Sequence, residues 1–137
     1  MPESRARRSW IGRIGRAEAT VQDADTSIAV GSGDVPVLGT PRLIALMEKA
    51  TCVAIEQFID DDFTSVGIGV DIAHRRPTPV GATVVATATV TSVDDARIRF
   101  EVSADHVLAS GERVEAIGRG TITRAVVERS AFTSDVD

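Results

Sequence analysis

The sequence contains a single cysteine, Cys52, in 137 residues, so the chain cannot form an internal disulfide. This cysteine usage fits a reducing compartment, and we expect a cytoplasmic protein. No apolar run approaches the ~20 residues that a membrane-spanning helix needs. One cysteine and two histidines give no metal-ligand spacing, and the motifs GxSxG, GxGxxG and the P-loop are absent. We therefore expect neither a metal site nor a membrane segment.

The charge of the chain also restricts its partners. A net charge of −5 argues against a general nucleic-acid binder, and 43% hydrophobic with 26% charged residues is ordinary for one soluble domain. The first sixteen residues, MPESRARRSWIGRIGR, differ because they carry five arginines and one acid. We expect residues 1–15 to form a disordered basic arm, residues 16–130 to form the domain and residues 131–137 to form a tail.

A long helix is predicted for residues 41–58. Thr40 stands where a side-chain cap would lie, and Pro41 suits the first turn because its missing N–H would have no partner there. At about 100° per residue, one face collects mainly apolar side chains, namely Leu43, Met47, Ala50, Thr51, Ala54 and Phe58. Lys49 and Glu56 lie opposite. This narrow polar strip predicts a helix that is enclosed on most sides.

Pairs of β-branched residues predict a strand before this helix, and period-two alternation of apolar residues predicts strands after it. One is expected within residues 17–30, and four more follow near 66–72, 83–91, 97–102 and 113–128. Because short turns link the last four, they are expected to pair antiparallel. The pattern predicts an α+β fold in which an antiparallel sheet of five to six strands wraps around one long central helix. The free face and edges of such a sheet need a partner, so we expect at least a dimer.

Glu48 is the first candidate for chemistry because it interrupts the apolar side of the helix. A boundary glutamate that reaches solvent is one interpretation. The other is a carboxylate in partly apolar surroundings, which is a good base or nucleophile near neutral pH. His74 continues the parity of Val66, Ile68, Val70 and Ile72, so its imidazole is expected to point at the helix layer. A histidine packed at the edge of the core fits the same pattern.

Two further residues have a simpler interpretation from the sequence alone. Thr40 has an adequate structural role as the helix cap, worth about 1 kcal/mol. His106 stands in the polar run SADHVLASG and is expected to face solvent in a turn.

Three stretches carry a family resemblance: VLGTPRLIALMEKATCVAI, SVGIGVDIAHRRPTPVGATVVATATV and AIGRGTITRAVV. Together they resemble hotdog-fold thioesterases of the fluoroacetyl-CoA thioesterase type, over residues 17–130. The most specific part is the spacing T-x7-E-x25-H, carried by Thr40, Glu48 and His74. The resemblance implies the hotdog fold and an enzyme without a metal or redox cofactor.

The resemblance also implies roles for individual residues in the hydrolysis of an acyl-CoA thioester. Glu48 would attack the carbonyl or activate water, His74 would handle protons, and Thr40 would donate a hydrogen bond that orients the carboxylate or the substrate. Gly67 matches a glycine near the thioester, where the absence of a Cβ lets the backbone approach the acyl group. Arg75 and Arg76 could bind CoA phosphates, although ordinary surface arginines fit the same positions.

The segment before the threonine departs from the family pattern. The fluoroacetate-specific enzyme has phenylalanines there, which form a lid over the acyl pocket. Here the segment reads GSGDVPVL, without an aromatic residue. Because of this departure, we expect the substrate to be another short or medium acyl-CoA and not fluoroacetyl-CoA.

Helix geometry adds an inference about assembly. Along one helix, the eight residues from Thr40 to Glu48 span about 12 Å, too far for a direct hydrogen bond. If the three residues share a site, a second copy must contribute, so we predict a two-fold homodimer with the site at its interface. Stacking of dimers into tetramers stays open. So do two alternative functions, a hotdog enoyl-CoA hydratase or dehydratase and a non-catalytic module that binds acyl-CoA or another small ligand.

Overall fold

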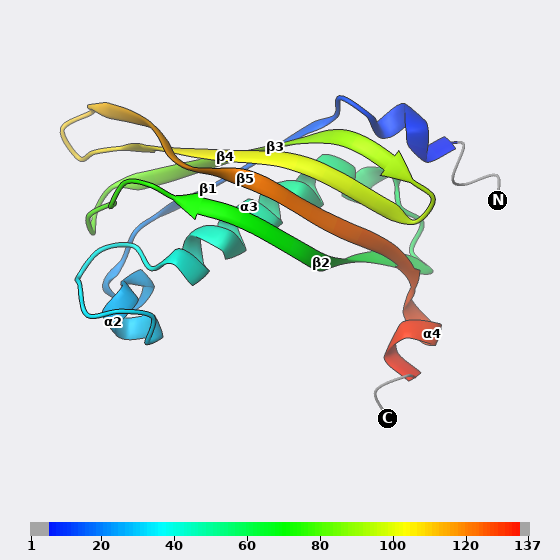
Figure 1. Cartoon of the computed structure of the whole chain (residues 1–137), viewed down its shortest axis with the longest axis horizontal. Helices are drawn as coiled ribbons and strands as arrows, with labels where there is room; N and C mark the ends of the chain where they lie inside the picture. The colour runs from blue at the N-terminus through cyan, green and yellow to red at the C-terminus, as the bar shows by residue number, and fades with distance from the viewer. Residues whose placement is uncertain (1–5, 135–137) are drawn as a thin grey trace.

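The computed structural model describes residues 6–134, which contain one five-stranded antiparallel sheet with the order β1-β3-β4-β5-β2. The strands are β1 (Ile14–Thr20), β2 (Phe63–His74), β3 (Thr83–Asp94), β4 (Arg97–Val107) and β5 (Arg113–Glu128). The helices are α2 (Ser27–Val30), α3 (Thr40–Ile55) and α4 (Arg129–Ser134), with short 3-10 turns η1 (Arg8–Trp10), η2 (Asp23–Asp25) and η3 (Glu56–Phe58). The sheet curls over α3 (Figure 1), which confirms the predicted α+β arrangement.

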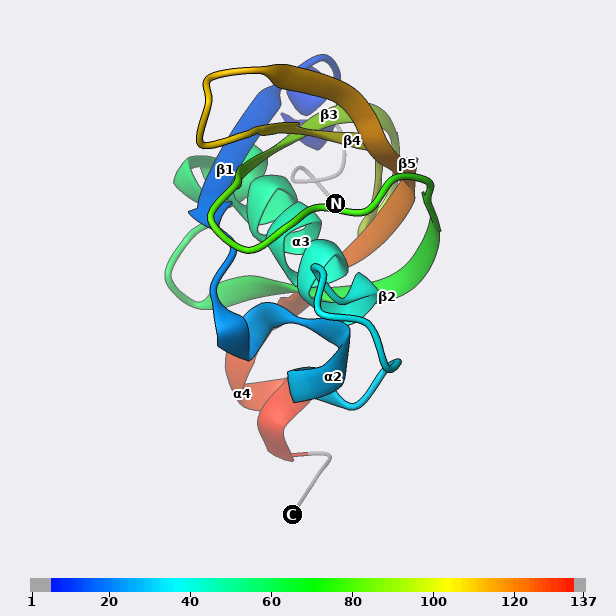
Figure 2. The ribbon, with the colours of Figure 1, turned by 90° about the vertical axis from the view of Figure 1, so that its left-hand side faces the viewer.

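Helix α3 lies inside the curl of the sheet, and Figure 2 shows strands on several sides of it. It begins at Thr40 and ends at Ile55, where η3 tightens the last turn. Its buried residues are Leu43, Met47, Ala50, Thr51, Ala54 and Ile55. Burying one leucine or methionine side chain contributes about 1.5–3 kcal/mol. The stripe predicted from the sequence therefore fixes the helix against the sheet.

Glycines determine how closely α3 approaches the strands. A Cβ built at Gly15 of β1 would overlap the backbone of Ala50 and Ala54. On β5, a Cβ at Gly118 would lie 2.8 Å from Leu43 Cδ2, which is too close without a shift. A larger residue at Gly15 would therefore push the helix outward, whereas one at Gly118 would first displace the Leu43 side chain.

The chain before β1 is packed against the domain, in contrast to the disordered arm expected for residues 1–15. Trp10 is buried and stacks on Phe58 with ring centroids 6.0 Å apart, and the Arg13 guanidinium lies 4.9 Å from the centre of the Phe58 ring. Arg7 is also buried and donates to the Asp95 carbonyl at 3.4 Å. Within the described part of that segment, aromatic contacts offset the charge that suggested disorder. Residues 1–5 lie outside the described residues.

The C-terminal segment expected as a tail, residues 131–137, is helical in its first part because α4 extends to Ser134. Residues 135–137 lie outside the described residues. Across residues 6–134, no helix reaches the length and apolarity that crossing a membrane takes.

Strand β2 contains a β-bulge that the sequence pattern did not reveal. Its register against β5 shifts between Gly67, which pairs with Arg124, and Gly69, which pairs with Thr123. The extra residue is Ile68. Since directly opposed residues point to the same face, the bulge reverses the parity of the strand. The alternation predicted that Val66 and His74 share a face. Because of the bulge, they do not.

Candidate active site

Thr40 and His74 meet at one end of the molecule. Thr40 is the first residue of α3 and His74 is the last residue of β2. Figure 1 shows the start of this helix and the end of this strand at the same end of the fold. Thr40 Oγ1 lies 2.8 Å from His74 Nδ1, a normal hydrogen-bond distance. Two residues of the predicted constellation are therefore in contact within one chain.

This contact corrects the expectation that Thr40 caps the helix. The N-cap is Gly39, with extended dihedrals of φ −73° and ψ 139°, and no side chain makes a cap hydrogen bond. Thr40 already belongs to the helix, so its hydroxyl cannot serve the orphan N–H groups in the manner of a cap. The hydroxyl bonds His74 instead.

The His74 imidazole is half-buried and incompletely paired. Its Nε2 atom is buried and has no hydrogen-bond partner within residues 6–134. Burial lowers the pKa of His74, and the nearby backbone of Arg76 offsets part of that effect. The ring is therefore neutral near pH 7, with one nitrogen bonded to Thr40 and the other unpaired among the described residues.

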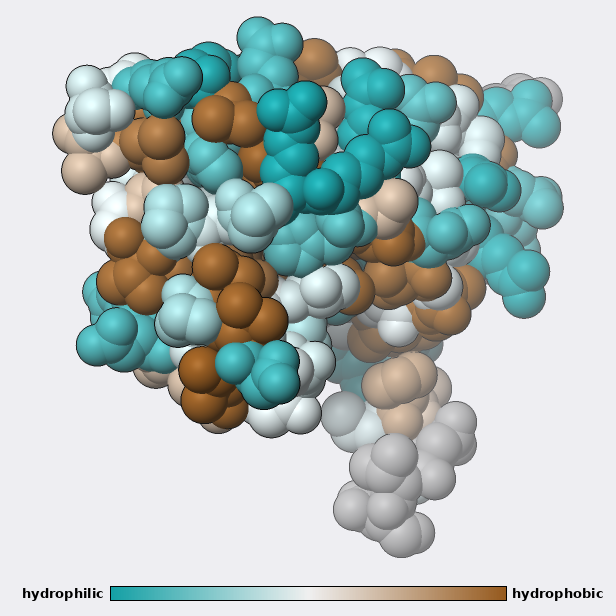
Figure 3. Space-filling model, turned by 60° about the vertical axis from the view of Figure 1, so that its left-hand side comes forward, coloured by the Kyte–Doolittle hydropathy of each residue, from teal (hydrophilic) through white to brown (hydrophobic). Residues whose placement is uncertain are grey.

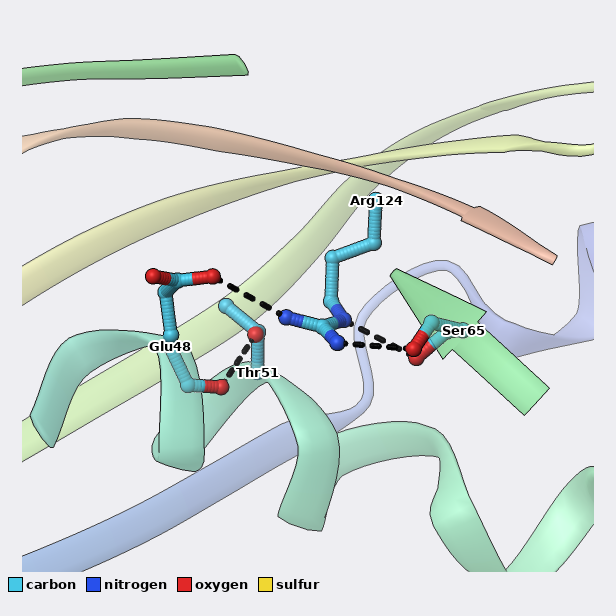
Figure 4. A network of polar contacts seen from close by, with 4 residues as sticks. All are labelled: Glu48, Thr51, Ser65 and Arg124. Carbon is cyan, nitrogen blue, oxygen red and sulfur yellow. Dashed lines mark hydrogen bonds and ion pairs between the residues drawn. The ribbon is translucent and has the colours of Figure 1, made fainter. Parts of the chain in front are cut away.

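Glu48 lies beside a buried arginine rather than in apolar surroundings. Its Oε2 atom is 3.4 Å from Arg124 Nη1, and the two side chains are 36% and 8% exposed. The guanidinium is fixed by Ser65 of β2, because Nε donates to Oγ and Nη2 donates to the backbone carbonyl, both at 2.9 Å (Figure 4). Glu48 is thus a partly exposed carboxylate whose one oxygen faces a fixed cation.

Arg124 is a residue of the site that the sequence reasoning did not single out. A signal was present, because Arg124 lies between Ile122 and Val126 in the alternation of β5, where its neighbours face the core. A charged residue in such a position needs a partner, since an unpaired buried charge is costly. Ser65 and Glu48 supply that partner.

Gly67 leaves the space that the Glu48 carboxylate occupies. A Cβ built on Gly67 would overlap Glu48 Oε2 and would lie 3.6 Å from Arg124 Nη1. The bulge at Ile68 matters here, because it lets Gly67 and His74 face the same side of β2 despite their odd and even numbers.

The site residues form two groups in the described chain. Thr40 bonds His74 at the start of α3, and Glu48 bonds Arg124 two turns further along. The structure records no hydrogen bond between these groups within residues 6–134. About 12 Å of helix separates them, as the sequence implied.

Arg75 and Arg76 are exposed and follow the site histidine directly. Their backbone N–H groups donate to the Ile117 carbonyl at 2.7 and 3.2 Å, which anchors the end of β2 to β5. Within the described residues, no group of three or more His, Cys, Asp or Glu side chains is arranged to hold a metal ion.

The polar neighbours of His106 suggested that it faces solvent, but it does not. It lies in β4, which runs on to Val107, and the residue is 3% exposed. Its place in the strand alternation, facing inward like Val102 and Ala104, outweighs the polarity of the run.

Comparison with known proteins places the chain in a family. A family model described as fluoroacetyl-CoA-specific thioesterase matches residues 21–130. A fluoroacetyl-CoA thioesterase of Streptantibioticus cattleyicolor is 33% identical over 100 residues, or 73% of this chain and 68% of that protein.

Solved structures agree with this assignment. The fluoroacetyl-CoA thioesterase FlK matches with a TM-score of 0.81 and 28% identity, covering 92% of this chain and 93% of FlK. A hot-dog-like protein from Thermanaerovibrio acidaminovorans matches with a TM-score of 0.80 over 95% of this chain and 93% of its own, and at 22% identity this likeness shows the fold alone. The chain therefore belongs to the family of fluoroacetyl-CoA-specific thioesterases, and it is a thioester hydrolase with the hotdog fold.

Proposed function

We propose that this chain hydrolyses the thioester of a short or medium acyl-CoA, with Thr40, Glu48 and His74 as its catalytic residues. The observation that carries the proposal is the neutral, half-buried His74, which Thr40 holds at Nδ1 while Nε2 has no partner within residues 6–134. When the Thr40 hydroxyl donates to Nδ1, Nε2 carries the ring proton. That proton can stabilise the thioester oxygen or pass to the departing CoA thiolate.

Glu48 supplies the carboxylate for either of two routes. Arg124 engages Oε2, so Oε1 is the oxygen left for chemistry. If Oε1 attacks the carbonyl, a mixed anhydride forms, CoA thiolate leaves and takes a proton, and water then splits the anhydride. If Oε1 instead takes a proton from water, the hydroxide attacks and the thiolate leaves directly. Both routes give a carboxylic acid and free CoA, and neither uses a metal or redox cofactor.

The relatives support the substrate class. A variant of FlK solved in complex with fluoroacetate and CoA matches this chain with a TM-score of 0.76 and 26% identity, covering 89% of this chain and 98% of its own. Arg75 and Arg76 are exposed next to His74 and are the proposed partners of the CoA phosphates.

The acyl group would lie near an apolar part of the surface around α2. Ile28, Val35 and Val80 are 54%, 51% and 44% exposed. The lobe that contains α2, at the lower left of Figure 3, shows several apolar side chains among polar ones. Because these residues are aliphatic and the segment before Thr40 lacks an aromatic lid, the proposed substrate is an alkyl acyl group rather than fluoroacetyl.

A homodimer through the edge of β2 would bring the two groups of site residues together. Strand β2 is an edge strand of 12 residues, with Ile68 50% and Val70 46% exposed. A long edge with exposed apolar side chains is a ready surface for pairing with a second copy. The Thr40–His74 pair of one copy would then face Glu48 of the other.

One register of that pairing would place residues of both copies in a single site. If two β2 strands pair antiparallel around a two-fold axis at Asp71, Ile72 lies opposite Val70 of the second copy. Counting the bulge as one position, His74 then lies opposite Gly67, which contacts Glu48. This register completes the proposed site with residues of both copies.

The activity test uses a panel of acyl-CoAs and follows the release of free CoA thiol. The single thiol of Cys52 in each chain is the background to be subtracted. Glu48→Gln and His74→Ala are each expected to lower kcat by about 100-fold or more. Glu101→Gln, an exposed glutamate of β4, is the matched control and should leave kcat unchanged. Thr40→Ser should retain most of the activity and Thr40→Ala should not. EDTA should have no effect.

Other outcomes select the alternatives. Hydration of an enoyl-CoA without thiol release would identify a hydratase, and saturable binding without either reaction would identify a binding module. For the dimer, Asp71→Cys in a Cys52→Ser background should cross-link two copies under oxidation. A monomer in sedimentation at assay concentrations, with full activity, would contradict the shared site.

A further inference from the structure

A second threonine–histidine pair is buried in the fold, and its threonine follows His74 of the Thr40–His74 pair by four residues. Thr78 is 0% exposed, His106 is 3% exposed, and Thr78 Oγ1 lies 2.7 Å from His106 Nδ1. Thr78 belongs to the connection between β2 and β3, four residues beyond His74, and His106 belongs to β4, the middle strand of the sheet. The hydrogen bond therefore ties an irregular segment to the centre of the fold.

Thr78 also holds the segment that leads into α3. Its carbonyl accepts a hydrogen bond from the Leu38 N–H at 2.9 Å, and Val37 and Pro79 form an antiparallel bridge. Leu38 is buried and lies two residues before Thr40. The position of Thr78 therefore determines where the chain enters the helix.

These contacts join residues 37–40 and residues 74–79 into a closed ring, which we call the clamp. At one end Thr40 bonds His74, and at the other Leu38 bonds Thr78. The backbone N–H groups of residues 75 and 76 tie the clamp to β5, and the side chain of Thr78 ties it to β4. A shift of Thr78 would thus move both segments that carry the site pair.

We infer that His106 is a positioning residue for the catalytic pair: through Thr78 it fixes the clamp, and through the clamp it fixes the geometry between Thr40 and His74. This inference rests on the proposed function and adds a residue to it. A buried hydroxyl needs a partner, and a neutral imidazole can serve as one. Burial lowers the pKa of His106, with partial compensation by Glu112, so the ring stays uncharged near neutral pH.

Matched substitutions separate the hydrogen bond from simple packing. Thr78→Val keeps the shape of the side chain and removes the hydroxyl, whereas Thr78→Ser keeps the hydroxyl. His106→Leu removes the bonding nitrogen, whereas His106→Asn places an amide near the position of Nδ1. Thr91→Val, at an exposed threonine of β3, is the control for the threonine-to-valine change.

Two readouts are measured on the full chain beside its melting temperature: kcat and KM for an acyl-CoA that the wild type hydrolyses, and the NMR signals of the His74 ring. The chain has two histidines, so His106→Asn identifies the remaining signal as that of His74. Thr78→Val and His106→Leu should each lower kcat about 10- to 100-fold with little change in KM, and should shift the His74 signals. Thr78→Ser and His106→Asn should stay close to the wild type. The double variant Thr78→Val/His106→Leu should be no worse than either single variant, because both remove the same bond.

The inference is overturned if Thr78→Val and His106→Leu fold, lower the melting temperature, and leave kcat and the His74 signals unchanged. His106 would then contribute only to packing. A wild type that releases no thiol from any acyl-CoA, while Thr78→Val still shifts the His74 signals, would refute the proposed function and leave the positioning of the Thr40–His74 pair supported.

Discussion

Replacing Arg124 by methionine tests whether the buried guanidinium orients the Glu48 carboxylate. Arg124→Met keeps most of the side-chain volume but removes the cation that faces Oε2. It also removes both hydrogen bonds to Ser65, each 2.9 Å long, which tie β5 to the edge strand β2. The carboxylate then loses the partner that holds one of its oxygens.

The effect on stability is expected to be moderate. Hydrogen bonds to a charged group contribute about 1.5–3 kcal/mol each. The 3.4 Å contact adds no more than about 1 kcal/mol, because the Glu48 side chain is 36% exposed to water. The variant no longer has to bury a charged guanidinium, and this gain offsets part of both losses. We therefore expect a net loss of about 1–3 kcal/mol in the free energy of unfolding. For a chain of this size that lowers the melting temperature by about 3–10 °C.

The effect on catalysis is expected to be of similar size in free energy, since about 100-fold in rate is about 2.7 kcal/mol. A carboxylate displaced by about 1 Å can cost about 100-fold in rate, so kcat should fall by about that factor. The measurement compares kcat and KM for thioester hydrolysis with thermal unfolding of the same variant. Arg119→Met, at an exposed arginine of the same strand, is the control. Unchanged kcat in an Arg124→Met protein with a reduced melting temperature would refute the reasoning and leave Arg124 as a link between two strands.

Three further predictions concern other parts of the molecule. Gly67→Ala should lower kcat with little change in unfolding temperature, since the added Cβ displaces only the flexible end of Glu48; wild-type kcat would contradict the close approach. Because burial lowers the pKa of both His74 and His106, the unfolded state binds more protons below about pH 6.5. The free energy of unfolding should therefore fall as pH drops from about 6.5 towards the lowered pKa values, and it should level off below them. Denaturant titrations across that pH range measure this free energy. A free energy that does not change with pH there would contradict the reasoning. Ile68→Lys should weaken the proposed dimer in sedimentation, whereas the same change at exposed Ile14 of the other edge should not.

Local patterns were sufficient to predict several elements of the fold, although the strand expected within residues 17–30 is β1 at Ile14–Thr20 and Ser27–Val30 is helical. The buried stripe of α3 follows helical spacing, and β3 and β4 alternate as expected, because burial on one face imposes a period on the sequence. The spacing of Thr40, Glu48 and His74 was also visible. Their mutual geometry could be predicted only in part, since the bond between Thr40 and His74 depends on how the end of β2 packs against the start of α3.

Features that depend on a neighbour distant in sequence could not be predicted. The bulge at Ile68 is defined by the register against β5, and alternation within β2 contains no trace of it. The packing of Trp10 depends on Phe58, which lies on the far side of α3 in the chain. His106 was misplaced because local polarity was given more weight than strand parity.

Strand β1 shows that the limits of a folding unit can differ from the limits of detectable similarity. The family match starts at residue 21, after β1 has ended. Yet β1 pairs with β3 along its whole length, and Gly15 lies against α3. A polypeptide trimmed to the matched span would expose an apolar flank of the central helix and an unpaired β3, so we expect it to aggregate when expressed, whereas a version that starts at residue 6 should remain dispersed.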